Sequence, residues 1–329
     1  MTYKKPWLSV DDQLALLVHR GLHIDNRIAA RACLERIGYY RLSGYLYAFR
    51  QRSGECCPLP KRANPQKTDR IVVDDFKDGS TLNGCVELYV FDKKLRSLVL
   101  DALERIEVSI RVDIAHLLGQ RNTFAYLSAN EFHESFARRD PGEEKSAHEK
   151  WLEKQSVLIA RSREDFILHN KNKTGLPLAI WIACEVWDFG ATYTLFKHMK
   201  QADQDKISAR YSINNGRTFS SWLETFNYIR NVCAHHNRLW NRNITKKPKL
   251  PSSHELPWIT SFLDKNGNAS SRCFLELMML AHLLKTINPN SSWSERVVGH
   301  LKSFPELNPV GLNLAGMGAP KNWEKLLTQ

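Results

Sequence analysis

A long apolar repeat between residues 82 and 118 constrains the fold of this chain more than any other feature of its sequence. Apolar side chains recur there at spacings of three or four, which is the period of one face of an α-helix. They are Leu88, Phe91, Leu95, Leu98, Leu103, Ile106, Ile110, Ile114 and Leu117. The segment therefore predicts one long, mostly buried helix or a pair of helices.

Two shorter helical patterns precede this repeat. The first begins at Ser9, a residue type common at helix N-caps, and ends near Gly21, while the second covers residues 26 to 37. Residues 51 to 72 contain prolines, a glycine and basic residues without apolar periodicity, which is typical of an exposed connector. We therefore expect an N-terminal helical module and its connector at residues 1 to 72.

The sequence beyond the repeat alternates between charged and apolar segments. Residues 137 to 154 are charged and predict a solvated helix or loop, whereas residues 178 to 195 are apolar and contain Gly190, which marks a helix end or a close contact. Residues 273 to 287 predict another apolar helix, and the tail after Phe304 has no regular pattern. A basic loop and a C-terminal helical extension are thus expected at residues 246 to 329.

Composition narrows the class of protein. Lys and Arg total 47 against 35 for Asp and Glu, and the resulting net charge of +12 favours a polyanionic partner such as nucleic acid, although a merely basic protein would look the same. Seven cysteines without a C-x-x-C pair argue against a disulfide framework and a zinc site. Asp11 and Asp12 interrupt any signal-peptide core, and no apolar run is long enough for a membrane span. We expect a cytoplasmic protein without a cofactor.

One helical segment, residues 219 to 240, carries the residues that best suit a reaction. Arg230 and His235 have the spacing R-x-x-x-x-H, and Asn231 shares a helix face with His235 at i and i+4. Cleaving RNA requires a base for the 2′-hydroxyl, an acid for the departing 5′-oxygen and a cation for the charged phosphate. A histidine can exchange the protons and an arginine can hold the phosphate oxygens, so no metal is needed. Asn231 would orient the imidazole or the phosphate.

The same motif also has a plain structural interpretation, because an arginine and a histidine on an amphipathic helix are usually surface or packing residues. The spacing occurs a second time at Arg111 and His116, without a polar residue after the arginine. Arg111 follows Glu107 by four residues, which predicts an ion pair within the helix. Glu107 and Arg111 could still support an active site.

Basic residues follow the motif directly. His236, Arg238 and Arg242 could bind phosphate or bases, or they could complement the dipole of a helix end. A loop further on adds three lysines that either contact phosphates or are simply solvated: Lys246, Lys247 and Lys249. The chain contains no H-E-x-x-H, no G-x-x-x-x-G-K and no G-x-S-x-G, which argues against zinc proteases, P-loop enzymes and α/β-hydrolases.

The chain contains, in this order, the phrases KPWLSVDDQLALLVHRGL, IGYYRLSGYLYAFR, LYVFDKKLRSLVLDALERIEVSIR, LPLAIWIACEVWDFG and YIRNVCAHHNRLWNR. Together, and in this order, they resemble the Abi-like proteins (the AbiD/AbiF group) of the HEPN superfamily. The resemblance implies an all-α fold with a HEPN-type helical bundle at residues 73 to 245, between the N-terminal module and the C-terminal helices. Tyr39, Tyr40 and Arg41 match the N-terminal signature, for which packing is the simplest role.

The resemblance also implies an activity. Members of the family act in abortive infection, in which cleavage of RNA halts the growth of a phage-infected bacterium. Arg230, Asn231 and His235 match the catalytic motif, and Glu107 with Arg111 match a polar pair on the earlier helix. We therefore expect a toxin-like endoribonuclease that leaves a 2′,3′-cyclic phosphate and acts as a homodimer, which would supply a second imidazole. The alternative is a non-catalytic protein that holds a small structured regulatory RNA, a partner associated with some family members.

Overall fold

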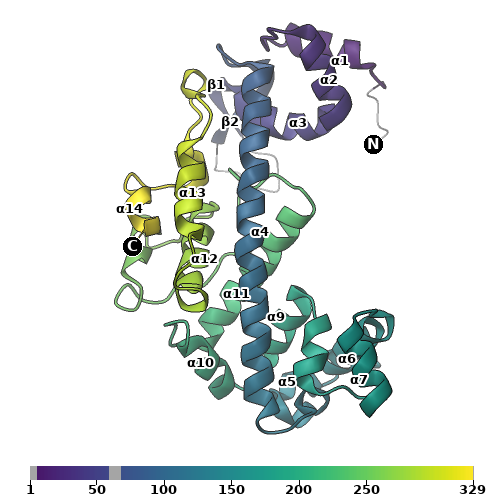
Figure 1. Cartoon of the computed structure of the whole chain (residues 1–329). Coiled ribbons are helices and arrows are strands. Elements are labelled where there is room, and N and C mark those ends of the chain that lie inside the picture. Colours follow the sequence, from purple (N-terminus) through teal and green to yellow (C-terminus); the bar gives the residue numbers. More distant parts are fainter. Residues whose placement is uncertain (1–5, 59–67, 329) are drawn as a thin grey trace.

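A single helix, α4 (Leu82–Gly119), runs along the whole length of the molecule in the computed structural model, which describes residues 6–58 and 68–328 (Figure 1). Thr81 caps its first turn by accepting from the amide of Gly84 at 2.9 Å. The predicted apolar face is buried at Leu88, Phe91, Leu95, Leu103, Ile106, Ile110 and Ile114, and partly buried at Leu98 and Leu117. The predicted long helix is therefore confirmed as one helix, and the all-α fold class is confirmed with it.

The N-terminal module consists of three helices at one end of α4. They are α1 (Val10–His19), α2 (Arg27–Ile37) and α3 (Tyr39–Leu46), followed by the short helix η1 (Tyr47–Phe49). Ser9 caps α1 in a capping box with Asp12, and Asn26 caps α2. The two predicted helices are thus confirmed, the first together with its predicted start at Ser9.

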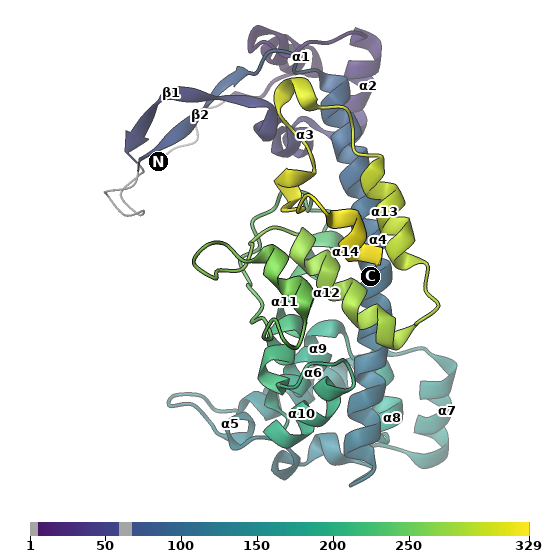
Figure 2. The same ribbon diagram turned by 90° about the vertical axis from the view of Figure 1, so that its left-hand side faces the viewer.

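A β-ribbon joins the module to α4, where the sequence predicted an irregular connector. Strand β1 (Arg50–Pro58) pairs antiparallel with β2 (Thr68–Phe76), and the ribbon extends away from α4 (Figure 2). Phe76 is buried, and its amide donates to the carbonyl of Arg20 at 2.8 Å. The segment at 51 to 72 therefore connects the two parts, but the expectation of irregular chain is wrong for 51–58 and 68–72, which are strands, while 59–67 lie outside the described residues. Three consecutive β-branched residues at 71 to 73 favour the strand.

The far half of α4 is surrounded by the middle of the chain (Figure 1). Its elements are η2 (Ala125–Leu127), η3 (Ala129–Glu131), α5 (Glu134–Ala137), α6 (Ala147–Arg161), α7 (Asp165–Thr174), α8 (Ile180–Ala183), η4 (Cys184–Val186), α9 (Phe189–His198), α10 (Gln201–Ala209) and α11 (Gly216–Ala234). The charged stretch is less solvated than predicted, since Trp151 of α6 is buried and donates to the carbonyl of Ala191 at 3.1 Å.

The C-terminal extension packs against the other half of α4. It contains η5 (Pro257–Phe262), α12 (Phe274–Ile287), α13 (Trp293–Lys302), η6 (Asn308–Val310), η7 (Leu314–Met317) and α14 (Trp323–Thr328). The helix predicted at 273 to 287 is confirmed as α12. The prediction that the tail after Phe304 is irregular is wrong for the residues that form α14. Trp293 fixes α13 to α4 by donating to the carbonyl of Leu98 at 2.7 Å. Within 6–58 and 68–328, no helix has the length and apolar character to cross a membrane.

Candidate active site

The R-x-x-x-x-H residues lie where α11 ends. The helix stops at Ala234 and not at residue 240 as predicted, because the chain closes a capping turn there. The amide of His236 donates to the carbonyl of Cys233 at 3.0 Å, and that of Asn237 donates to Val232 at 2.9 Å. This pair of bonds is the Schellman cap of a helix C-terminus. Its left-handed position is occupied by His236, with φ +57°, where glycine is usual.

This turn determines how the three motif residues are presented. His235 is the C-cap residue, and its amide still donates to the carbonyl of Asn231 at 3.0 Å, so the predicted i and i+4 relation is kept. Asn231 and His235 are exposed, whereas Arg230 is half-buried. The left-handed conformation of His236 costs free energy for a residue with a side chain, and such strain is concentrated at functional sites.

Helix α4 brings Glu107 and Arg111 to the buried side of this motif. The guanidinium of Arg111 binds the carboxylate of Glu107 and also donates to the carbonyl of Trp187, so the predicted ion pair is confirmed. Burial raises the pKa of Glu107, and the positive charges of Arg111 and Arg230 oppose that shift. The charge of Arg230 on α11 therefore acts on Glu107, which links the predicted support pair electrostatically to the predicted catalytic arginine.

The N-terminus of α9 completes this side of the site. Asp188 caps α9 by accepting from the amide of Ala191 at 2.7 Å, and its negative charge further raises the pKa of Glu107. A Cβ on Gly190 would lie 3.3 Å from Asp188 Oδ1 and 3.6 Å from Asn227 Oδ1, so α9 closely approaches α11 one turn before Arg230. Gly190 lies in the first turn of α9, where it makes the close contact that was one of the two predictions for it. Asp188 and Asn227 were not predicted, and the signal for Asp188 was its N-cap position before Phe189 and Gly190.

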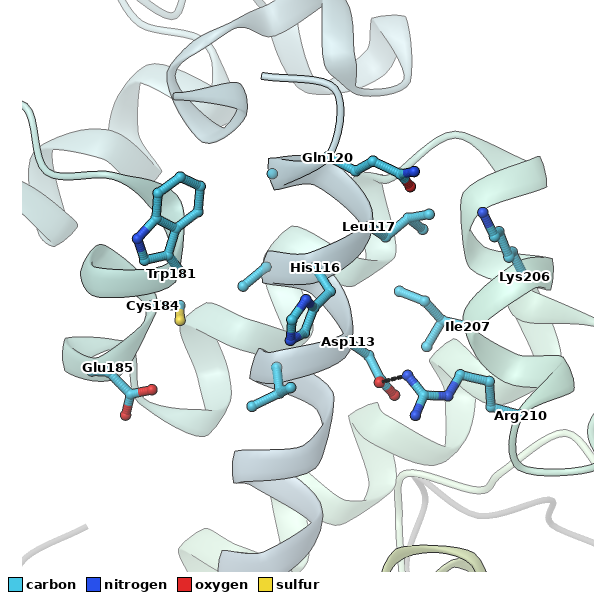
Figure 3. Close-up of a pocket in the computed structure, with 13 residues that line it drawn as sticks. Asp113, His116, Leu117, Gln120, Trp181, Cys184, Glu185, Lys206, Ile207 and Arg210 are labelled. Carbon is cyan, nitrogen blue, oxygen red and sulfur yellow. Dashed lines mark hydrogen bonds and ion pairs between the residues drawn. The ribbon is translucent and has the colours of Figure 1, made fainter. Parts of the chain in front are cut away.

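The second R-x-x-x-x-H match does not form a comparable site. Arg111 is turned toward Glu107 and the carbonyl of Trp187, while His116 lines a separate hollow of about 710 Å³ at the far end of α4 (Figure 3). In that hollow Asp113 accepts from Arg210 and from the hydroxyl of Tyr211. Arg111 and His116 of this second match therefore lie in different environments.

A buried network joins three distant segments beneath the motif. Asp92 of α4 is 0% exposed and accepts from the hydroxyl of Tyr45 at 2.6 Å, from the amide of Trp240 at 2.7 Å and from Arg96. Burial raises the pKa of Asp92, an effect opposed first by the charge of Arg96 and then by these hydrogen bonds. The network attaches the N-terminal module and the segment after His236 to the central helix. Sequence reasoning did not identify it.

The N-terminal module also touches the turn directly. Arg41 of α3 donates to the carbonyl of His236 at 2.7 Å, and Arg238 donates to the carbonyl of Gly44. The packing role expected for the N-terminal signature suits Tyr39, which is half-buried, but is wrong for Tyr40, which is 76% exposed. Arg41 of this signature instead binds the backbone of His236.

The predicted basic residues divide into two groups. Arg238 and Arg242 lie beside the turn, and Arg242 Nε donates to the hydroxyl of Tyr228 at 2.8 Å. The three lysines lie along the first half of α11, where Lys246 pairs with Glu224 at 3.0 Å and the carbonyl of Lys249 accepts from Trp222 at 2.9 Å. At the helical rise per residue, this region is about 15 to 20 Å from the end of α11. The lysines are therefore not part of the same cluster.

The described part of the chain offers no group of three or more His, Cys, Asp or Glu side chains suited to a metal ion. Cys33, Cys85, Cys184, Cys233 and Cys273 are free thiols, and all of these except Cys33 are buried. Burial raises the pKa of Cys184 and of Cys233 to about 12.

Comparison with known proteins identifies one related family. Residues 32–241 match the family described as Abi-like protein. The match begins within α2, covers α3, α4 and α11 and ends just after Trp240, so it contains both the motif and the buried network beneath it. Neither the curated proteins nor the solved structures include a match to this chain.

Proposed function

The chain belongs to the Abi-like protein family, and from that premise we propose that it is a metal-independent endoribonuclease of the HEPN type that acts in bacterial abortive infection. Defence of this kind requires an activity that stops growth of the infected cell, and cleavage of cellular RNA meets that requirement. The net charge of +12 suits a polyanionic substrate.

The observation that carries the proposal is the placement of the motif at the end of α11. Asn231 and His235 are exposed, so an RNA backbone can reach them, while half-buried Arg230 lies within electrostatic reach of Glu107. The arrangement thus combines an accessible imidazole with a half-buried arginine whose charge acts on Glu107. Strain at His236 fits a turn that is kept for a function.

Each residue then has a role in one transesterification. His235 takes the proton from the 2′-hydroxyl, the 2′-oxygen attacks phosphorus, and the bond from phosphorus to the 5′-oxygen breaks. Arg230 holds the non-bridging oxygens as negative charge builds on them, and Asn231 orients the imidazole or the phosphate. The products are a 2′,3′-cyclic phosphate and a 5′-hydroxyl. Glu107 is a positioning residue that acts through Arg111 and Arg230.

A proton donor is also needed on the opposite side of the phosphate, where the 5′-oxygen leaves. One copy of the motif supplies one catalytic imidazole, so the proposal includes a homodimer in which His235 of a second copy protonates that oxygen. Light scattering during chromatography tests this part. Full cleavage activity in a fraction that contains only monomer would contradict it.

The proposal is tested by incubating purified protein with total bacterial RNA in EDTA, in parallel with His235→Ala and His116→Ala. We expect His235→Ala to lose about 10²- to 10⁴-fold in cleavage rate while keeping its RNA affinity. His116→Ala, which alters the second R-x-x-x-x-H match, should cleave normally. Tight RNA binding without any cleavage that depends on His235 would favour a protein that only holds a small structured regulatory RNA.

A further inference from the structure

A hollow of about 740 Å³ lies beside the motif, between the N-terminal module and the turn that ends α11. The module contributes Tyr40, Arg41 and Tyr47 to its lining, and the segment after His235 contributes Arg238 and Arg242. His236 also lines it, so the hollow begins one residue from the proposed catalytic imidazole.

Four arginines meet in and around this hollow without a carboxylate partner. Each is held by a neutral oxygen, so it keeps its charge in a fixed place: Arg41 by the carbonyl of His236, Arg238 by that of Gly44, Arg242 by the hydroxyl of Tyr228 and Arg272 by the carbonyl of Asn241. Among the residues whose side chains the structure describes, 6–53 and 72–328, none of the four is in an ion pair with Asp or Glu. Several arginines elsewhere in the described residues do pair with carboxylates, among them Arg31, Arg105 and Arg121.

The charges of these arginines also act on one another. Burial lowers the pKa of Arg238, and the positive charges of Arg242 and Arg272 lower it further. The negative charge of Asp92 opposes this lowering of the Arg238 pKa, but its carboxylate already binds Arg96 and the backbone amides of Leu239 and Trp240. A bound anion would remove the repulsion, and planar guanidinium groups are well suited to the oxygens of phosphate.

Exposed aromatic rings flank the charged cluster. Tyr40 is 76% exposed and Tyr47 is 52% exposed, although both belong to helices whose other faces are buried. Exposed rings next to guanidinium groups are the arrangement by which proteins bind single-stranded nucleic acid, since each base stacks on a ring and each phosphate meets a cation.

We propose that this hollow binds the single-stranded RNA segment next to the cleaved phosphate. The arginines hold its phosphates, Tyr40 and Tyr47 stack on its bases, and the N-terminal module thereby takes part in the choice of substrate. The inference rests on the proposed ribonuclease function for the position of the cleaved bond, whereas binding of the RNA can be measured independently of cleavage.

The test measures the affinity of His235→Ala for a labelled single-stranded RNA of about 12 nucleotides over a range of salt concentrations. Arg242→Gln with Arg272→Gln in that background should weaken binding at least about tenfold. It should also flatten the slope of log K against log salt by about 1.4, because two phosphate contacts are lost from a single strand. The matched control is Arg161→Gln with Arg163→Gln, which removes the same charge at exposed positions beyond the hollow.

Two further variants separate recognition from folding. Arg242→Lys keeps the charge and should keep most of the salt slope, and Tyr40→Phe should bind RNA as the parent does, whereas Tyr40→Ala should bind about tenfold more weakly. If the variant with Arg242→Gln and Arg272→Gln has the same salt slope as the control pair, the proposal is overturned, even if the protein cleaves RNA. Conversely, loss of RNA binding in the variant with Arg242→Gln and Arg272→Gln would support RNA binding in the hollow, even if the protein cleaves no RNA. Equal binding of a duplex of the same length would contradict the stacking, since paired bases cannot reach the rings.

Discussion

Glu276 gives the most quantitative prediction about this fold. It lies on α12 (Phe274–Ile287), is 2% exposed, and receives no hydrogen bond from any other described residue at either carboxyl oxygen. Burial raises its pKa from 4.5 to about 8. A carboxyl group in this position is uncharged in the folded protein at neutral pH but ionised in the unfolded chain.

The difference in pKa has a defined effect on stability. Between the unfolded and folded pKa values, unfolding releases a proton, so the free energy of unfolding falls as the pH rises. The loss is about 1.4 kcal/mol for each pH unit, which amounts to about 1 kcal/mol at about pH 5 and about 4 kcal/mol at about pH 7.5. Glu276→Gln removes this dependence because the amide does not ionise. Any fixed cost of burying the amide adds equally at both pH values.

The assay is urea unfolding of the parent, Glu276→Gln and the exposed control Glu144→Gln at these two pH values. We expect Glu276→Gln to gain about 3 kcal/mol relative to the parent between the lower and the higher pH, and Glu144→Gln to gain nothing. A difference between Glu276→Gln and the parent that is the same at both pH values would refute the reasoning. It would mean that Glu276 is ionised, or reaches water, in the folded protein.

Three other predictions concern the site and its supports. Asp92→Asn should lower the free energy of unfolding by about 3 to 5 kcal/mol in urea denaturation, because it leaves the buried charge of Arg96 without its partner. Glu107→Gln should lower kcat for RNA cleavage about tenfold with little change in KM, because Arg230 loses a nearby negative charge, and a KM effect alone would argue against positioning. Exchanging the three loop lysines for glutamine should flatten the salt dependence of RNA binding less than the Arg242 and Arg272 pair does, since they lie about 15 to 20 Å from the end of α11. The lysines are Lys246, Lys247 and Lys249.

The parts of the fold that the sequence predicted are those set by neighbouring residues. Ser9 and Asn26 cap their helices because a cap depends on the next three residues. The helix at 82 to 118 follows from an uninterrupted apolar period, and the ion pair of Glu107 and Arg111 follows from their spacing on that helix.

The parts that it did not predict depend on contacts between distant segments. Asp92 accepts from the amides of Leu239 and Trp240, which follow it by 147 and 148 residues, and nothing in the local pattern indicates that pairing. The β-ribbon was missed because its strands are stabilised by each other. The end of α11 was placed too late because the left-handed position of its cap is occupied by His236, where glycine is the usual signal.

The candidate site also has features set by neighbouring residues and features set by distant segments. The residue types and spacing of Arg230, Asn231 and His235 indicated a possible reaction, because the chemistry requires an imidazole and a guanidinium close together, and the resemblance of several phrases to the Abi-like proteins supported it. The contact of Arg41 with the carbonyl of His236 joins residues that are 195 positions apart, so the contribution of the N-terminal module emerged only from the three-dimensional arrangement.

The most direct test of the central claim is to identify both ends of the RNA fragments that the purified protein produces in EDTA. Attack by the 2′-oxygen, with His235 as the proton acceptor, predicts a 2′,3′-cyclic phosphate on one fragment and a 5′-hydroxyl on the other. Fragments with a 3′-hydroxyl and a 5′-phosphate would show that water and not the 2′-oxygen is the nucleophile. That result would contradict the role assigned here to the motif at the end of α11.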